Sequence, residues 1–199
     1  MKITKEQLEQ IEKFARKHMA NNDAWHNIEH VEQTVKAAKY LASKENADVN
    51  TCIIAAWLHD ISKHKEQKND HINHGTDASK VAKQFLLKLG FDAKDVDDIC
   101  YVIYMHNKTR VGKTVESKIL WDADKLRCVG PYGLVTGVSN FCYLGLLQEE
   151  AIIKTADEYG EYVFGQFRTT TAQNLEKKYM KLMDKFHQLY REVRDMDFK

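Results

Sequence analysis

The sequence predicts an all-α fold, and two observations carry this prediction. Pro131 is the one proline in 199 residues, and four of the nine glycines lie within residues 130–145. The rest of the chain therefore has few of the turn-forming residues that would connect short strands. Apolar residues also recur at three- and four-residue steps along most of the chain, which is the spacing of one helix face. With 43% hydrophobic residues, the chain can bury a substantial core, and we expect one domain without internal repeats.

Each expected helix follows from this periodicity. The helices should cover, in order, residues 8–18, 27–45, 49–62, 71–90, 93–106, 115–129, 148–165 and 175–193. The segment 49–62 is the most apolar and is expected to be central. Gly90 stands where a helix should stop, and Asp92 where the next should be capped. The segment GPYGLVTGVSNFCYLG, residues 130–145, predicts a short helix plus a loop.

Charge and cysteine usage exclude several classes of protein. Thirty basic and 29 acidic side chains leave a formal charge of +1, so neither a nucleic-acid polymer nor an anionic membrane is an expected partner. The four cysteines lack a C-x-x-C spacing and predict reduced thiols in a reducing compartment. No segment reaches the roughly 18 apolar residues of a membrane span. We therefore expect a soluble, unprocessed cytoplasmic protein.

The stretch CIIAAWLHDISK, residues 52–63, places an acidic residue in a buried-looking segment. An ionised Asp60 in a dry interior costs several kcal/mol unless it is paired or binds a metal. On a helix, His59 and Asp60 point about 100° apart, which lets both reach one divalent cation beside the helix. A helix-end aspartate bonded to backbone or to lysine is the alternative for an isolated pair.

Further histidines and an aspartate flank the predicted helix ends: His26, His30, His74, His106 and Asp124. His26 and His30 are four residues apart, so they project from one helix face and could share a pocket. In DADKL, residues 122–126, the two aspartates lie on different faces, and we choose Asp124. Taken singly, these residues could be a cap, a surface side chain or a helix-end cation, but jointly they indicate a metal site.

The ordered set His30, His59-Asp60 and Asp124 resembles the HD-domain superfamily of metal-dependent phosphohydrolases. Five segments resemble, in order, those of a small bacterial HD hydrolase subfamily: WHNIEHV, AAWLHDISK, YVIYMHNKT, ESKILWDADKLRCVGPYGL and FRTTTAQNLEKKYMKLMDKF. The resemblance covers most of the chain. It implies a single HD-type helical domain over residues 1–199, with a motif core at about 20–135 and C-terminal helices 148–199 packing on it.

The resemblance also implies roles for individual residues. The implied ligands of a divalent ion (Mn, Ni, Co, Fe, Mg or Zn) are His30, His59, Asp60 and Asp124. The implied catalytic set is Asp60, His26, Lys63 and His106. Of these, Lys63 and the two histidines would neutralise phosphate, and the histidines could instead hold a second metal. Ser62 departs from the glycine common at this position in the superfamily, which puts the local backbone, but not the ligand set, in doubt.

The function implied is hydrolysis of a phosphate ester or phosphoanhydride bond of a nucleotide or similar small phosphorylated substrate. A metal would lower the pKa of bound water from 15.7 toward about 7 and so supply the nucleophile. Two alternatives stay open. One is an HD-fold di-iron oxygenase using His74 and His106, which the number of metal ions per chain would distinguish from the hydrolase. The other is a non-catalytic nucleotide-sensing module. The sequence leaves the oligomeric state open, a homo-oligomer included, and residues 130–145 could form a lid, a substrate wall or a subunit contact.

Overall fold

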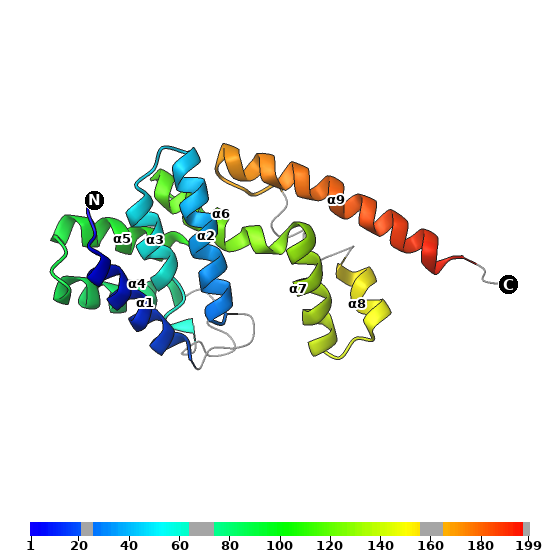
Figure 1. Ribbon diagram of the computed structural model, residues 1–199, viewed down its shortest axis with the longest axis horizontal. Helices are drawn as coiled ribbons and strands as arrows, with labels where there is room; N and C mark the ends of the chain where they lie inside the picture. The colour runs from blue at the N-terminus through cyan, green and yellow to red at the C-terminus, as the bar shows by residue number, and fades with distance from the viewer. Residues whose placement is uncertain (21–25, 64–73, 156–164, 197–199) are drawn as a thin grey trace. The chain divides into compact units, whose positions relative to one another are not determined.

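A computed structural model of the chain describes residues 1–20, 26–63, 74–155 and 165–196. All regular structure in these ranges is helical, so the all-α prediction is confirmed (Figure 1). The chain divides into two compact units, Met1–Asp124 and Lys125–Lys199. The expectation of a single domain stays a prediction. No helix in the described part of the chain is both long and apolar enough to cross a membrane.

The unit Met1–Asp124 is built around one central helix. Its helices are α1 (Lys5–Met19), α2 (Ile28–Lys44), α3 (Val49–Leu58), α4 (His74–Lys88), α5 (Ala93–Met105) and α6 (Val115–Lys125), the last ending one residue beyond the unit. Helix α3 packs against α1, α2, α4 and α5, as its apolar sequence predicts (Figure 1). Ile54 and Leu58 are completely buried there. Because α3 is enclosed on several sides, the residues that follow it begin inside the core.

Local capping fixes where these helices begin and end. The side chain of Asn27 accepts a hydrogen bond from the backbone N–H of His30 (3.1 Å), which places that histidine in the first turn of α2. Asp48 caps α3 in the same way through the N–H of Thr51 (2.8 Å). Gly90 adopts a φ of +79° just past α4, at the predicted stop. Asp92 precedes α5 as expected, but its side chain makes no capping hydrogen bond.

Helix α3 is shorter than the sequence predicts. It ends at Leu58 rather than at residue 62, and residues 59–63 form a turn. The His59 ring nitrogen Nδ1 lies 2.8 Å from the carbonyl oxygen of Ala56, and the N–H of Lys63 donates to the carbonyl of Asp60 (3.0 Å). These short-range bonds replace the helical ladder. His59 and Asp60 therefore follow the helix end.

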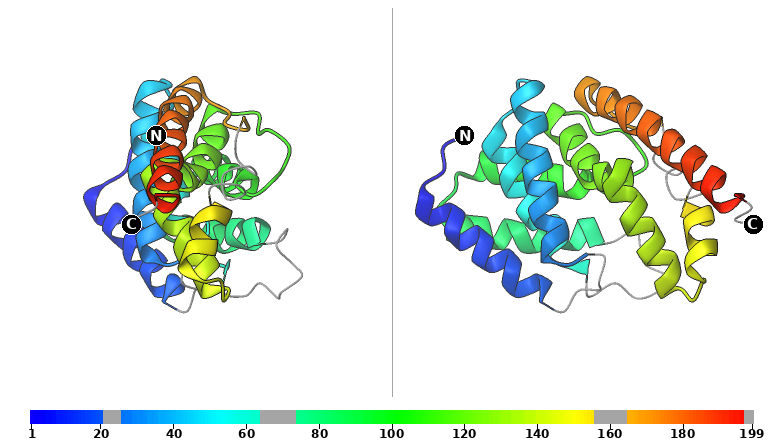
Figure 2. Two further views of the ribbon diagram at one scale, coloured as in Figure 1. Left: turned by 90° about the vertical axis from the view of Figure 1, so that its right-hand side faces the viewer. Right: turned by 45° about the vertical axis from the view of Figure 1, so that its right-hand side comes forward.

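The unit Lys125–Lys199 contains a 3-10 turn, η2 (Leu126–Cys128), and three helices: α7 (Gly130–Tyr143), α8 (Gln148–Lys154) and α9 (Thr170–Arg194). Helix α7 contacts η2, α8 and α9, and Figure 2 shows α7 and α8 side by side. The prediction of a short helix plus a loop at residues 130–145 was wrong, since α7 has 14 residues. Pro131 stands in its first turn, where proline favours a helix rather than interrupting one.

Candidate metal centre

Six side chains from five parts of the unit Met1–Asp124 converge on one buried region. They come from the first turn of α2, the turn after α3, the start of α4, the end of α5 and the last turn of α6: His30, His59, Asp60, His74, His106 and Asp124. The ends of helices supply all of them. The ends of packed helices thus place imidazole and carboxylate groups together in the part of this unit that the structure describes.

The first group consists of His30, His59, Asp60 and Asp124. The Nε2 atoms of the two histidines lie 3.2 Å apart. Asp124 Oδ1 is 3.2 Å from His30 Nε2 and 3.8 Å from His59 Nε2. Asp60 Oδ2 is 3.4 Å from His59 Nε2 and 3.6 Å from His30 Nε2. The structure therefore brings together all four residues named as metal ligands from the sequence.

The second group consists of Asp60, His74 and His106. Asp60 Oδ1 lies 3.4 Å from His106 Nε2 and 3.5 Å from His74 Nε2, and these two nitrogens are 3.0 Å apart. The Asp60 carboxylate thus presents one oxygen to each group. A carboxylate placed in this way can bridge two cations, which sequence spacing alone did not predict.

Hydrogen bonds orient the imidazole rings toward Asp60. His59 Nδ1 lies 2.8 Å from the carbonyl oxygen of Ala56, and His106 Nδ1 lies 2.6 Å from that of Ile103. A carbonyl oxygen only accepts, so Nδ1 is the protonated nitrogen in both rings, and in the neutral imidazole Nε2 keeps its lone pair. This arrangement is the one that metal-binding histidines use to fix ring orientation.

Burial and neighbouring charges set the ionisation of the cluster. Burial acts to raise the pKa of Asp60, but the charge of His59 and the imidazole nitrogens of His106 and His30 close to the carboxylate outweigh it and hold that pKa well below its usual range. Burial likewise acts to lower the pKa of His59, but Asp60 raises it overall. For His106, burial dominates and lowers the pKa to about 4. Near neutral pH, an ionised carboxylate therefore faces a neutral His106.

The donor atoms lie within a few tenths of an ångström of the separations that a metal ion needs. A divalent ion held at about 2.0–2.2 Å keeps neighbouring ligand atoms roughly 3.0–3.4 Å apart in tetrahedral or octahedral geometry. The separations between histidine nitrogens, and between these nitrogens and the aspartate oxygens, run from 3.0 to 3.8 Å within the two groups. His30, His59 and Asp60 form one set of three potential ligands, and Asp60, His74 and His106 form another. Mixed imidazole and carboxylate donors suit Mn, Fe, Co, Ni and Zn.

The remaining predicted residues lie beside the cluster. His26 precedes α2, and its ring centroid is 5.9 Å from that of His30, edge to face. Lys63 lies three residues after Asp60, and both His26 and Lys63 are partly exposed. His106 belongs to the second group of ligands. His74, which the sequence offered only for a second iron in the oxygenase alternative, lies in the second group with it.

Asn107 is a further residue that sequence reasoning missed. Its side-chain nitrogen lies 3.3 Å from His74 Nδ1 and so holds that ring toward Asp60. A single asparagine after His106 gives no signal of its own in the sequence. Its place beside the site comes from the packing of α4 against α5.

The HD domain family matches residues 27–127 of this chain. The matched segment contains both groups of potential ligands, and the chain belongs to this family. In fold, the chain is similar to the crystal structure of a predicted HD superfamily hydrolase from an uncultured Thermotogales bacterium, at 26% sequence identity and a TM-score of 0.73. That match covers 94% of this chain and 92% of the other.

YpgQ of Bacillus subtilis, an uncharacterized protein, is 26% identical over 134 residues, which are 64% of this chain. The chain spans 63% of the length of YpgQ in that sequence match. The structure of YpgQ in complex with ADP has the same fold, with a TM-score of 0.72, 19% identity and coverage of 97% of this chain and 96% of that one. The buried His/Asp cluster is of the kind typical of the HD-domain metal site.

Proposed function

We propose that this protein is a metal-dependent phosphohydrolase that uses metal-activated water to cleave a phosphate ester or phosphoanhydride bond of a nucleotide or similar small phosphorylated substrate. The observation that supports it most is the buried Asp60 carboxylate, whose two oxygens each face a pair of histidines. Membership of the HD domain family and similarity to a predicted HD superfamily hydrolase support the same reaction class.

Each group of side chains would hold one metal ion. His30, His59, Asp60 and Asp124 would hold one ion, and Asp60 with His74 and His106 would hold a second. A bound ion supplies a Lewis acid and lowers the pKa of its water, which makes hydroxide available near neutral pH. The Ala56 and Ile103 carbonyls keep two rings aimed, so little reorganisation is needed when the cations bind.

His26 and Lys63 are the proposed phosphate-binding side chains. Both are partly exposed and flank the cluster, His26 beside His30 and Lys63 three residues after Asp60. A lysine ammonium holds a phosphate oxygen as a point charge. Because they would contact substrate rather than metal, replacing either should raise KM and leave metal content unchanged.

A nucleotide is the favoured substrate class. The support is the relative YpgQ, which was crystallised with ADP. A non-catalytic nucleotide-sensing module is the corresponding alternative, and saturable nucleotide binding without product would identify it. The intact ligand set favours catalysis, because a sensor would not need so many buried, mutually oriented metal-binding groups.

The second group of ligands favours one other candidate function, a di-iron oxygenase. Two sets of His and Asp ligands sharing one carboxylate can hold two irons as well as two hydrolytic metals. Metal count alone therefore no longer separates the two reactions, and the product must be identified. Release of phosphate or pyrophosphate without oxygen consumption supports the hydrolase, whereas iron-dependent oxygen uptake with an organic substrate supports the oxygenase.

The deciding experiment screens the purified protein against nucleotides and other phosphorylated metabolites with Mn²⁺, Co²⁺, Ni²⁺, Mg²⁺ or Fe²⁺, and detects inorganic phosphate and pyrophosphate. Asp60→Ala should lose both metal and turnover. Asp98→Ala, the same change at an exposed position of α5, is the matched control and should keep both. Undiminished hydrolysis by metal-depleted Asp60→Ala protein would falsify the proposal.

A further inference from the structure

Helix α9 carries an apolar edge that the unit Lys125–Lys199 leaves uncovered. Four large apolar side chains, spaced four, three and four residues apart, are exposed by 38 to 56%: Leu182, Phe186, Leu189 and Val193. At 3.6 residues per turn they fall in one narrow stripe, called here the α9 stripe. The adjacent edge is packed, since Met183 is buried and Tyr179 lies against Gly130 of α7.

The spacing of the α9 stripe is that of a helix that pairs with another helix. Steps of four, three and four residues follow the heptad positions a and d, whose repeat of 3.5 residues keeps one seam facing a partner helix. Phe186 stacks with Tyr190, with ring centroids 6.3 Å apart, so an aromatic pair lies along this edge. The stripe therefore resembles half of an antiparallel or parallel helix pair.

The charges beside the stripe favour an antiparallel partner with the same sequence. Lys185 and Glu192 lie seven residues apart along one flank of the stripe, and both are exposed. Gln188 donates a hydrogen bond to Glu192 (3.0 Å), which holds that carboxylate along the helix. If two copies of α9 are laid antiparallel about a twofold axis between residues 187 and 188, Lys185 of each copy stands near Glu192 of the other.

The same alignment matches the apolar side chains. Leu182 of one copy faces Val193 of the second copy, and Phe186 faces Leu189, with every contact repeated by the symmetry. A self-complementary patch of this type is what a twofold homodimer requires. Parallel pairing would bring Lys185 beside Tyr190 and leave Glu192 without a basic partner on the seam. Charge and shape thus select the antiparallel pair.

Most of the exposed large apolar side chains lie in the unit that carries the α9 stripe, Lys125–Lys199. Of the fourteen large apolar side chains that are exposed among the described residues, three lie before Lys125: Tyr40, Leu87 and Val111. The other eleven belong to Lys125–Lys199. Four of these eleven form the α9 stripe, so this unit carries most of the exposed apolar side chains from which an interface could be built.

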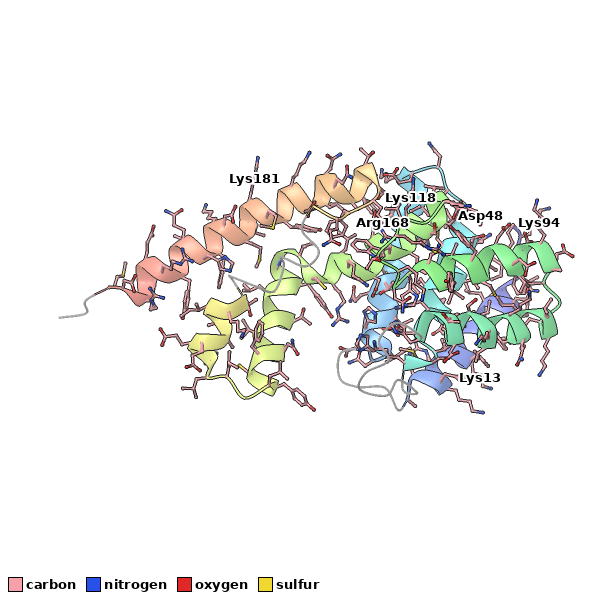
Figure 3. All side chains as sticks on the ribbon, turned by 180° about the vertical axis from the view of Figure 1, so that it is seen from behind. Lys13, Asp48, Lys94, Lys118, Arg168 and Lys181 are labelled. Atoms are coloured by element: carbon pink, nitrogen blue, oxygen red, sulfur yellow. The ribbon has the colours of Figure 1, made fainter. Side chains whose placement is uncertain are left out.

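We propose that two copies of this chain form an antiparallel homodimer through the α9 stripe, with reciprocal Lys185–Glu192 ion pairs across the twofold axis. Lys181, labelled in Figure 3, projects from α9 outside the stripe and stays in solvent. Three turns of paired helix bury less surface than a standard stable interface, so the dimer should dissociate in roughly the micromolar range.

The test is a charge reversal measured by sedimentation velocity over a wide range of protein concentrations. Lys185→Glu brings two carboxylates together at each of the two symmetric contacts, and Glu192→Lys brings two ammonium groups together there. Each single change should raise the dimer dissociation constant by about tenfold or more, because two ion pairs become two repulsions. The control Lys177→Glu reverses a charge on the opposite side of α9 and should leave the constant unchanged.

Mixing the two reversal variants separates this geometry from any other dimer. In the mixed dimer, the two substituted side chains form one ion pair of reversed polarity, and the native Lys185 and Glu192 form the other. Dimerisation should therefore return when the variants are combined. A wild-type chain that stays monomeric at every concentration overturns the proposal. So does a dimer that both single reversals leave intact, or one that mixing fails to restore. The measurement uses mass alone and does not depend on enzymatic activity.

Discussion

His30 and His59 lie 29 positions apart in the chain, yet their Nε2 atoms are separated by 3.2 Å. The Nδ1 of His59 is committed to the Ala56 carbonyl, so its Nε2 must either keep a lone pair or take a second proton. In the metal-free protein, Asp60 raises the pKa of His59 despite its burial. A proton on this imidazole then supplies the positive charge that a metal would otherwise bring.

Metal binding should therefore release protons from the cluster. On the order of one proton per chain should leave near neutral pH, because a metal ligand must be neutral imidazole. Calorimetric titration with Mn²⁺ in two buffers of different ionisation enthalpy measures this release as a difference in apparent binding enthalpy. Affinity should also fall as the pH is lowered. Identical enthalpies in both buffers would contradict the expected exchange of proton for metal.

His74→Ala should remove one of two bound ions. His74 lies 3.5 Å from Asp60 Oδ1 and is the ligand of the second group that α4 supplies, whereas the first group keeps all four of its side chains. Metal analysis after saturation and desalting should give about one ion fewer per chain than in the wild type. His18→Ala, the same change on α1, should leave the count unaltered. An unchanged metal count in His74→Ala would remove His74 from the site.

Much of the fold followed from the sequence because helix periodicity is a local property. Apolar spacing predicted α1, α2 and α9, and Gly90 marked the end of α4. What failed depended on particular contacts: the ring of His59 helps to end α3 at Leu58, and Pro131 stands in the first turn of a 14-residue helix where a short helix plus a loop was expected. The stripe of α9 predicted a helix but not that one edge would stay exposed.

The proximity of the four side chains of the first group could be expected from the sequence, because each of them stands in a recognisable segment. That of the second group could not be, since His74 and His106 are 32 positions apart and meet only because α4 packs against α5. From the sequence, both histidines were candidate ligands of a second ion, but the distance between them could not be predicted. The bridging role of Asp60 likewise depends on which way each oxygen points, and spacing along a chain carries no such information.

Gly75→Ala should weaken the second ion without removing a ligand. Gly75 is buried in the first turn of α4, and a Cβ there would lie 2.7 Å from Asn107 Oδ1 and 3.1 Å from His106 Cε1. His106 and the asparagine that contacts His74 must therefore move. We expect about tenfold weaker binding of the second ion in a metal titration, with the first ion unaffected.

Weaker metal binding by Gly75→Ala should not come from a less stable α4. Alanine favours a helix over glycine by about 0.5–1 kcal/mol, so general loss of folding is not the expected cause of weaker binding. Lys80→Ala changes an exposed position of the same helix and should leave both ions in place. If Gly75→Ala bound both ions with wild-type affinity, the positions of His106 and Asn107 would not matter for the second ion, and the prediction would be wrong.

Acidification should destabilise the metal-free protein through His106. Burial lowers the pKa of this imidazole from 6.5 to about 4, so the unfolded chain binds its proton more readily than the folded one. A group with a depressed folded pKa stabilises the fold fully above its unfolded pKa and loses that contribution as pH falls, here between about 6.5 and 4. The loss is about 3 kcal/mol at most, and the raised pKa of His59 opposes it. In urea unfolding with a chelator, the free energy of unfolding of the wild type should exceed that of His106→Gln by an amount that shrinks from neutral pH to about pH 4. A difference that stays constant with pH would show that His106 is not the group that titrates.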